Sequence, residues 1–432
     1  MKKSISLFQA LSIVIGMIIG SGIFFKPAKV LSDAGSSGMA LLAWIAGGII
    51  TLASALTIAE IASNIPKAGG LYTYLETLYG KKWGFLLGWV QSIISYPASV
   101  AAQAIVFADC AVYFIPMTDW QKRFLAIGVL AFVLICNILS TRCGAFVQVI
   151  ATIGKLIPIA VILAFGLPGG KASGALGLQS GNASSIGTAI LGTLWAYDGW
   201  ISVTNMGAEM KNPKKNIPRA IIIGMLSVTA VYALFNLVIF NTLPAEVLAT
   251  TENVGVDVAV ALFGQKGATL INTGIMISVF GALNGYLMTA ARVPHAMAEK
   301  KLLPASRVIG KIHPRFDTPT NALILQAVLA VVYICTGTFN TLTDLLVFVL
   351  WIFFTLGVIG IFILRHRKMS SKECYRVPLY PIVPIIGAAG GVFILISTLI
   401  GAPVRSLIGI AITLVGIPVY YFLEKSNARQ TK

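Results

Sequence analysis

Long apolar runs, separated by short polar connections, are the feature that most limits how this chain can fold. A helix needs about 20 apolar residues to cross the core of a bilayer, and the runs here reach that length. The chain is 57% hydrophobic and only 11% charged, whereas a soluble domain carries about a quarter charged residues. This pattern excludes a soluble enzyme, a disordered chain and a disulfide scaffold. It predicts an all-α integral membrane protein.

Turn and charge signals divide the chain into twelve apolar runs, each of which is expected to form a transmembrane helix. The segment 66–80 is too polar to span and is expected to form a short interfacial helix, whereas 244–263 is too interrupted and should lie outside the membrane. The expected spans are 8–33, 39–64, 84–115, 124–141, 144–167, 184–206, 217–241, 267–298, 319–337, 341–365, 380–401 and 404–424.

The strong positive charge of the chain agrees with this topology. A net charge of +17 in a soluble protein would favour nucleic-acid binding. Here the basic residues lie in the connections without an aromatic platform, so no nucleic-acid partner is expected. With a cytoplasmic N-terminus, roughly three quarters of the 32 lysines and arginines fall in cytoplasmic loops, as the positive-inside rule requires. We expect a multi-pass protein of the plasma membrane, here the bacterial inner membrane, with both termini cytoplasmic and membrane lipid around it.

Residues that could support catalysis or metal binding are scattered. The five cysteines form no CxxC pair, and the three histidines have no metal-ligand spacing, so neither a metal site nor a disulfide framework is expected. No nucleophile stands beside a base at one depth, which argues against an enzyme, and no cofactor is implied. The spans are also too apolar for the continuous polar lining of a channel.

Two of the expected spans are interrupted near their middles. The first contains Gly20-Ser21-Gly22, and each glycine weakens a helix by roughly 1 kcal/mol. The sixth contains Trp195 and then Asp198-Gly199, and a carboxylate in hydrocarbon costs several kcal/mol unless it faces protein or water. Close helix packing is the alternative explanation for the first interruption, and a paired structural carboxylate is the alternative for Asp198.

The positions of the interruptions favour a transporter. They open two halves of five spans each, 8–167 and 184–367, followed by spans 11 and 12 at 380–424, within one transporter domain of 1–432. Because five is odd, a repeat of the first half must enter the membrane from the opposite face, which is typical of inverted-repeat transporters. Broken helices expose amides that suit a carboxylate and carbonyls that suit an ammonium. An α-amino acid carries both groups.

Several motifs resemble a known family. GMIIGSGIF at 16–24, PKAGGLYTYLE at 66–76 and GAEMKNPKKNIPRA at 207–220 resemble the amino acid–polyamine–organocation superfamily. AYDGW at 196–200 and Lys155 are similar to its L-type amino-acid transporter family. The resemblance implies a LeuT-type fold, a 5+5 inverted repeat with two further helices. It also implies a sodium-independent antiporter that exchanges small neutral L-amino acids such as alanine, serine and cysteine by alternating access.

The resemblance also implies roles for particular residues. The amides of Ser21 and Gly22 would bind the substrate carboxylate. The carbonyls of Ile18 and Trp195 would accept from its ammonium, and the Trp195 ring would cover the substrate from outside.

Three more features follow from the same family pattern. Asp198 and Gly199 complete the implied substrate-binding set. Some members of the family have glycine in place of Asp198. Gly20 belongs to the implied gating region. Eukaryotic members are bonded to a glycoprotein subunit through a cysteine between spans 3 and 4. The corresponding loop, 116–122, has no cysteine, so no heavy-chain subunit is expected.

Lys155 lies about eleven residues into the fifth span, near the middle of a 30 Å core by the rise of an α-helix. A buried ammonium needs acceptors, and the alternative is a lysine in a water-filled vestibule without a special role. The resemblance implies that Lys155 replaces a sodium ion, bonding carbonyls of span 1 and a hydroxyl of span 8, for which Ser278 is the candidate. If Lys155 instead titrates during transport, the protein would be a proton-coupled symporter.

Overall fold

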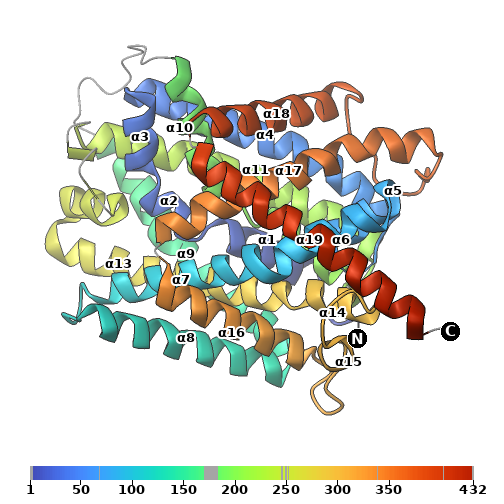
Figure 1. Ribbon diagram of the computed structural model, residues 1–432. Coiled ribbons are helices and arrows are strands. Elements are labelled where there is room, and N and C mark those ends of the chain that lie inside the picture. Colours follow the sequence, from blue (N-terminus) through green and yellow to red (C-terminus); the bar gives the residue numbers. More distant parts are fainter. Residues whose placement is uncertain are drawn as a thin grey trace.

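The computed structural model describes residues 3–67, 69–169, 183–244, 247–248, 251, 253–337, 339–401 and 403–430. The regular secondary structure of these ranges is helical, with an isolated bridge between Ile5 and Met210 as their β-type pairing. The long helices lie side by side in one bundle, and the chain begins and ends at its right-hand side in Figure 1. We call this side the terminal face and the other side the opposite face.

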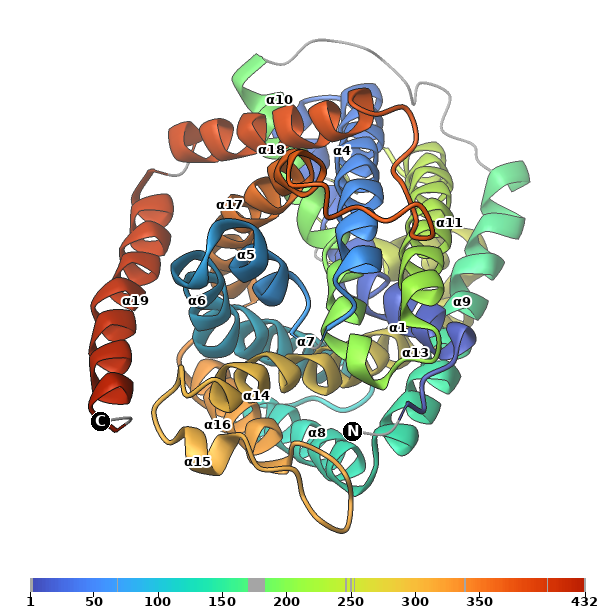
Figure 2. The same ribbon diagram turned by 90° about the vertical axis from the view of Figure 1, so that its right-hand side faces the viewer.

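The helices have the following bounds in chain order: α1 (Leu7–Ile18), α2 (Gly22–Phe25), α3 (Pro27–Ala34), α4 (Ser37–Asn64), α5 (Leu71–Tyr79), α6 (Lys81–Val90), the π-helical turn η1 (Gln91–Ser95), α7 (Tyr96–Ala111), α8 (Asp119–Leu139), α9 (Thr141–Gly169), α10 (Ala183–Ala196), the 3-10 segment η2 (Trp200–Glu209), α11 (Pro213–Thr242), α13 (Val254–Ala290), α14 (Arg292–Glu299), α15 (Ser306–Ile309), α16 (Thr320–Thr336), α17 (Phe339–His366), α18 (Ile382–Gly401) and α19 (Pro403–Gln430). Seen from the terminal face, α1 lies inside the bundle against α9, α11 and α13, whereas α19 lies at its edge (Figure 2).

The all-helical membrane fold predicted from the sequence is confirmed. Among the described residues, ten helices are long and apolar enough to cross a membrane, and α16 is a shorter apolar helix. With the broken pair α10–η2, these elements account for the twelve expected spans. The short helix expected within 66–80 is present as α5.

Two spans differ from their expected form. The eighth was expected to begin at residue 267, but α13 begins at Val254, because Asn253 caps it by accepting from the amide of Val256 at 3.3 Å. A kink at Gly264, with φ of 69°, separates this first part from the rest. The third expected span, 84–115, contains the π-helical turn η1 just before Pro97, a residue that cannot donate a backbone hydrogen bond. Residues 245–246, 249–250 and 252 of the expected outer segment lie outside the described residues.

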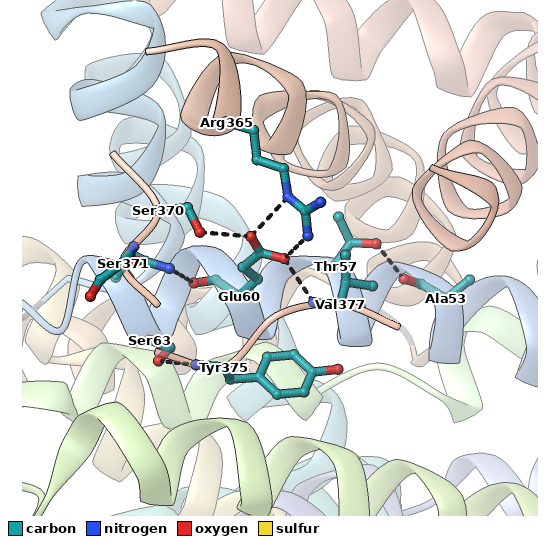
Figure 3. Close-up of polar contacts among 10 residues, drawn as sticks. Ala53, Thr57, Glu60, Ser63, Arg365, Ser370, Ser371, Tyr375 and Val377 are labelled. Carbon is teal, nitrogen blue, oxygen red and sulfur yellow. Dashed lines mark hydrogen bonds and ion pairs between the residues drawn. The ribbon is translucent and has the colours of Figure 1, made fainter. Parts of the chain in front are cut away.

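A buried carboxylate at the terminal face fixes the connection between α17 and α18 (Figure 3). Glu60, at the end of α4, is 0% exposed. It accepts hydrogen bonds from Arg365 Nε at 3.0 Å and Nη2 at 2.8 Å. It also accepts from Ser370 Oγ at 3.1 Å and from the amide of Val377 at 2.7 Å. The connection is thereby held against α4.

Candidate functional site

The first interruption separates the end of α1 at Ile18 from the start of α2 at Gly22. The amide of Gly20 donates back to the carbonyl of Ile18 at 2.9 Å. Within the described residues, no backbone carbonyl accepts from the amides of Ser21, Gly22 or Ile23. The Ser21 hydroxyl is fully buried and also lacks a partner there. Because the first amides of a helix carry partial positive charge and need acceptors, this turn can bind a carboxylate.

The second interruption lies between the end of α10 at Ala196 and the start of η2 at Trp200. Gly199 has φ of 103°, a left-handed conformation that residues with a Cβ rarely adopt. The amide of Asp198 donates to the carbonyl of Trp195 at 3.1 Å, so this expected acceptor for an ammonium already has one donor. The left-handed Gly199 therefore ends the regular helix between α10 and η2.

The two interruptions face each other at close range. A Cβ atom added to Gly22 would lie 2.5 Å from the Cα atom of Ala196, and one added to Gly199 would lie 3.0 Å from the Cβ of Met17. The backbones are thus in direct contact, and both glycines are required for the approach. The interruptions predicted from the sequence are confirmed as real breaks.

Tyr232 of α11 connects the two breaks, and the sequence analysis missed it. Its hydroxyl lies 2.8 Å from the carbonyl of Ile18 and 2.9 Å from that of Ala196. The hydroxyl has one proton and can donate to one of these carbonyls at a time. Its ring packs on those of Trp44 and Tyr197, with centroids 5.5 and 5.0 Å away. The single tyrosine of the seventh expected span was the available signal.

Lys155 of α9 is fully buried beside the first break. Its Nζ donates to the carbonyls of Gly16 at 2.6 Å and Ile19 at 2.5 Å. Ser278 of α13 donates its hydroxyl to the same Ile19 carbonyl at 3.1 Å. The expected bond between Lys155 and the Ser278 hydroxyl is therefore replaced by a shared acceptor, because the break leaves the Ile19 carbonyl open to both donors. No carboxylate in the described ranges forms an ion pair with Lys155.

Asp198 takes part in a polar contact on the other side of the breaks. The Tyr286 hydroxyl of α13 donates to Asp198 Oδ2 at 2.8 Å. Both residues border a cavity of about 10 Å³, which is room for roughly one water molecule. The space beside Asp198 is therefore too small for an amino acid in this structure. The other lining residues are Gln91, Ser95, Tyr96, Ser99, Ile201, Ser202, Leu350 and Phe354.

Comparison with known proteins decides the family. Residues 5–423 match the family model described as amino acid permease. The chain belongs to the amino acid permease family. It is 45% identical over 430 residues to the serine/threonine exchanger SteT of Bacillus subtilis, covering 99% of this chain and 98% of the relative. The protein is therefore a multi-pass membrane transporter rather than an enzyme, and the resemblance drawn from the motifs is confirmed.

Two human proteins extend this family relationship. The chain is 31% identical to the human b(0,+)-type amino acid transporter 1, covering 98% of this chain and 88% of the relative. It is 32% identical to the human cystine/glutamate transporter, with coverage of 98% and 85%. The similarity thus extends over nearly the whole permease.

Trp195 of the permease lies toward the opposite face. It is buried, with 5% of its surface exposed, and it lines a pocket of about 490 Å³ between α3, α10, α17, α18 and α19. The exposed ion pair of Lys29 and Asp33, at 3.1 Å, belongs to the same pocket. The indole is therefore in a position to separate this pocket from the two breaks.

A buried ion pair lies between η2 and α14 toward the terminal face. Arg292 Nε donates to Glu209 Oε1 at 2.8 Å and Nη2 donates to Oε2 at 3.1 Å, with 2% and 3% of the two side chains exposed. Arg292 Nη2 also lies 3.1 Å from the hydroxyl of Thr141 in α9. The carbonyl of Glu209 accepts from the amide of Ile5 at 3.0 Å. The sequence analysis missed this pair, whose signal was the acidic residue within the motif at 207–220.

Proposed function

We propose that this permease exchanges small neutral L-amino acids across the membrane by alternating access, without sodium. The observation that carries the proposal is the contact between two broken helices with open amides at Ser21 and Gly22. These amides suit a substrate carboxylate. The carbonyl of Ile18 close by suits an ammonium when the Tyr232 hydroxyl donates to the carbonyl of Ala196 instead. Peptide dipoles fixed in a dry site bind such charges more strongly than they would in water.

Lys155 supports the absence of a sodium requirement. Its ammonium joins the carbonyls of Gly16 and Ile19 on α1 from its place on α9. A permanent cation at this point supplies the charge that a bound sodium ion would otherwise supply. A proton-coupled symporter is the second candidate, favoured by one observation: the acceptors of Lys155 are neutral carbonyls, so its proton can leave without separating an ion pair.

The substrate class rests on side chains around the breaks and on the relatives. Bulky Ile18 and Trp195 beside the breaks favour small substrates. Tyr286 already donates to Asp198, so that carboxylate needs no cationic substrate as a partner. SteT is named for exchange of serine and threonine, which supports small hydroxyl-bearing substrates beside alanine and cysteine.

The proposal also assigns a membrane topology and a gate on each side of the substrate site. The halves 8–167 and 184–367 would be the inverted repeats, and the terminal face would be cytoplasmic. Trp195 would close the site from outside, and the pair of Glu209 and Arg292 would close it from inside. Gly20 and Gly199 would supply the backbone freedom at the two breaks. The chain is proposed to work without a heavy-chain subunit.

Flux in proteoliposomes that contain only the purified chain tests the proposal. Labelled serine should enter vesicles preloaded with unlabelled serine or alanine, equally in sodium and choline buffers, and should not enter empty vesicles. A panel of internal amino acids then gives the substrate range. Uptake into empty vesicles driven by a proton gradient would support the symporter instead, and equal uptake into empty vesicles without any gradient would overturn exchange.

A further inference from the structure

A recess separate from the two breaks lies at the edge of the bundle, where α19 packs on α6 and α17 (Figure 2). Its volume is about 450 Å³, and nearly all of its lining side chains are apolar or aromatic. It opens between membrane-spanning helices, so lipid rather than water surrounds most of it. The lining residues are Lys82, Trp83, Leu86, Ile352, Phe353, Ile410, Thr413, Leu414, Ile417, Tyr420 and Tyr421.

The recess has the length of one lipid leaflet. Along α19 it extends from Ile410 to Tyr421, about 16 Å at the rise of an α-helix. Half of a bilayer core is about 15 Å. Tyr421 lies near the terminal face and Ile410 near mid-depth. The recess therefore follows the path of one acyl chain from the headgroup region to the bilayer center.

The end of the recess at the terminal face is positively charged. Lys82 Nζ lies 4.7 Å from the centroid of the Tyr421 ring and donates to its hydroxyl. Lys81 and Lys82 are exposed at the first turn of α6, where helix amides favour an anion. The nearby carboxylate of Glu424 already accepts from the Tyr420 hydroxyl at 3.1 Å. An anionic headgroup therefore meets lysine charge at the mouth of an apolar recess.

We infer that this recess binds an anionic glycerophospholipid of the leaflet at the terminal face. The phosphate contacts Lys82 and the first amides of α6, and one acyl chain lies between α6, α17 and α19. The charge at the mouth distinguishes this occupant from a zwitterionic lipid, and the leaflet-length recess distinguishes it from a short amphiphile.

The recess shares a helix with the central cavity. Ile352 and Phe353 of α17 line the recess, whereas Leu350 and Phe354 line the cavity beside Asp198. The lipid chain thus packs on one side of the helix segment whose other side borders the two breaks. A lipid bound in the recess can therefore affect the packing of α17 beside the central cavity without contacting the substrate.

Retention of defined lipids on the purified full-length protein tests the inference. The probes are phosphatidylglycerol and phosphatidylcholine with identical chains, and native mass spectrometry measures bound lipid after mild delipidation. Wild-type protein should retain phosphatidylglycerol about fivefold better, as one interfacial lysine contributes. Lys82→Gln should remove that preference, and Lys311→Gln, at an exposed lysine of the α15–α16 connection, should keep it.

A second variant tests the apolar part. Leu414 is 52% exposed and lines the recess, so Leu414→Trp fills the space with little risk to folding and should reduce retention of both lipids. Equal retention of the two lipids by wild-type protein, or an unchanged preference in Lys82→Gln, would overturn the inference. Displacement of phosphatidylglycerol by oleate at equal concentration would likewise overturn it, since any anionic amphiphile would then suffice.

Discussion

Lys155 and Arg292 are both buried cations that contact a broken span, yet their acceptors differ in kind. Lys155 donates to two backbone carbonyls of α1. Arg292 is paired through two hydrogen bonds with the carboxylate of Glu209, at the end of η2. One region fixes the first break, and the other closes the bundle toward the terminal face.

The difference indicates which contact can open. The carbonyls that bind Lys155 are available because α1 is interrupted, so the ammonium and the break stabilise each other. Buried opposite charges cost desolvation, and each charge regains hydration when it reaches water. The pair of Glu209 and Arg292 can therefore separate when water enters from the terminal face. This contrast predicts a permanent contact at Lys155 and a reversible one at Arg292.

The largest effect is expected from Lys155→Ala, which leaves the carbonyls of Gly16 and Ile19 without their cation. The Gly16 carbonyl loses its donor and the Ile19 carbonyl keeps only Ser278. A buried acceptor without a donor costs about 1–3 kcal/mol, and the charge of the cation is lost as well, so exchange of labelled serine in preloaded vesicles should fall by about a hundredfold. Lys266→Ala, at an exposed lysine of α13, is the matched control and should exchange normally. Wild-type exchange kinetics in Lys155→Ala would refute the coupling role.

A smaller but clear loss is expected from Glu209→Gln, which leaves the Arg292 charge buried without a counterion. Breaking one partner of a buried pair costs about 3–5 kcal/mol, part of which water entering the opened terminal face should offset. Thermal unfolding in detergent should show lower stability, and exchange per folded molecule should change as well. If exchange per folded molecule stays at the wild-type level, the pair is structural and does not act as a gate.

Glu60→Gln sharpens the comparison, because Glu60 and Arg365 have the same chemistry away from the two breaks (Figure 3). Arg365 is 25% exposed and can be hydrated, so the loss of stability should be about 1–3 kcal/mol. Exchange per folded molecule should remain normal, in contrast to Glu209→Gln. Glu373→Gln, at an exposed glutamate of the same connection, should leave both measurements unchanged.

The smallest effect is expected from Ser278→Ala, which removes one of the two donors to the Ile19 carbonyl. A single hydrogen bond contributes about 1 kcal/mol, so exchange should fall no more than about fivefold while Lys155 remains bound. Thr273→Ala removes a hydroxyl that bonds within α13 to Thr269 and serves as the control. A loss in Ser278→Ala as large as that in Lys155→Ala would mean that the hydroxyl, rather than the ammonium, holds the break.

The two helix breaks were predictable because backbone propensity depends on the residues at the break itself. Glycine and polar residues inside apolar runs weaken a helix wherever it packs, so the breaks at Gly20–Gly22 and at Gly199 could be found from the chain alone. The start of α13 was misplaced because the Asn253 cap, rather than hydropathy, sets it.

The sequence by itself determined the membrane class, the number of apolar spans, the two breaks and the buried position of Lys155, since these depend on hydropathy and backbone propensity along the chain. Tertiary structure alone decided that Tyr232 joins both breaks, that Ser278 shares the Ile19 carbonyl with Lys155, and that Arg292 finds Glu209. Such partners lie many residues apart. Hydrogen bonds depend on distance and direction in space, which packing sets and residue order does not encode locally.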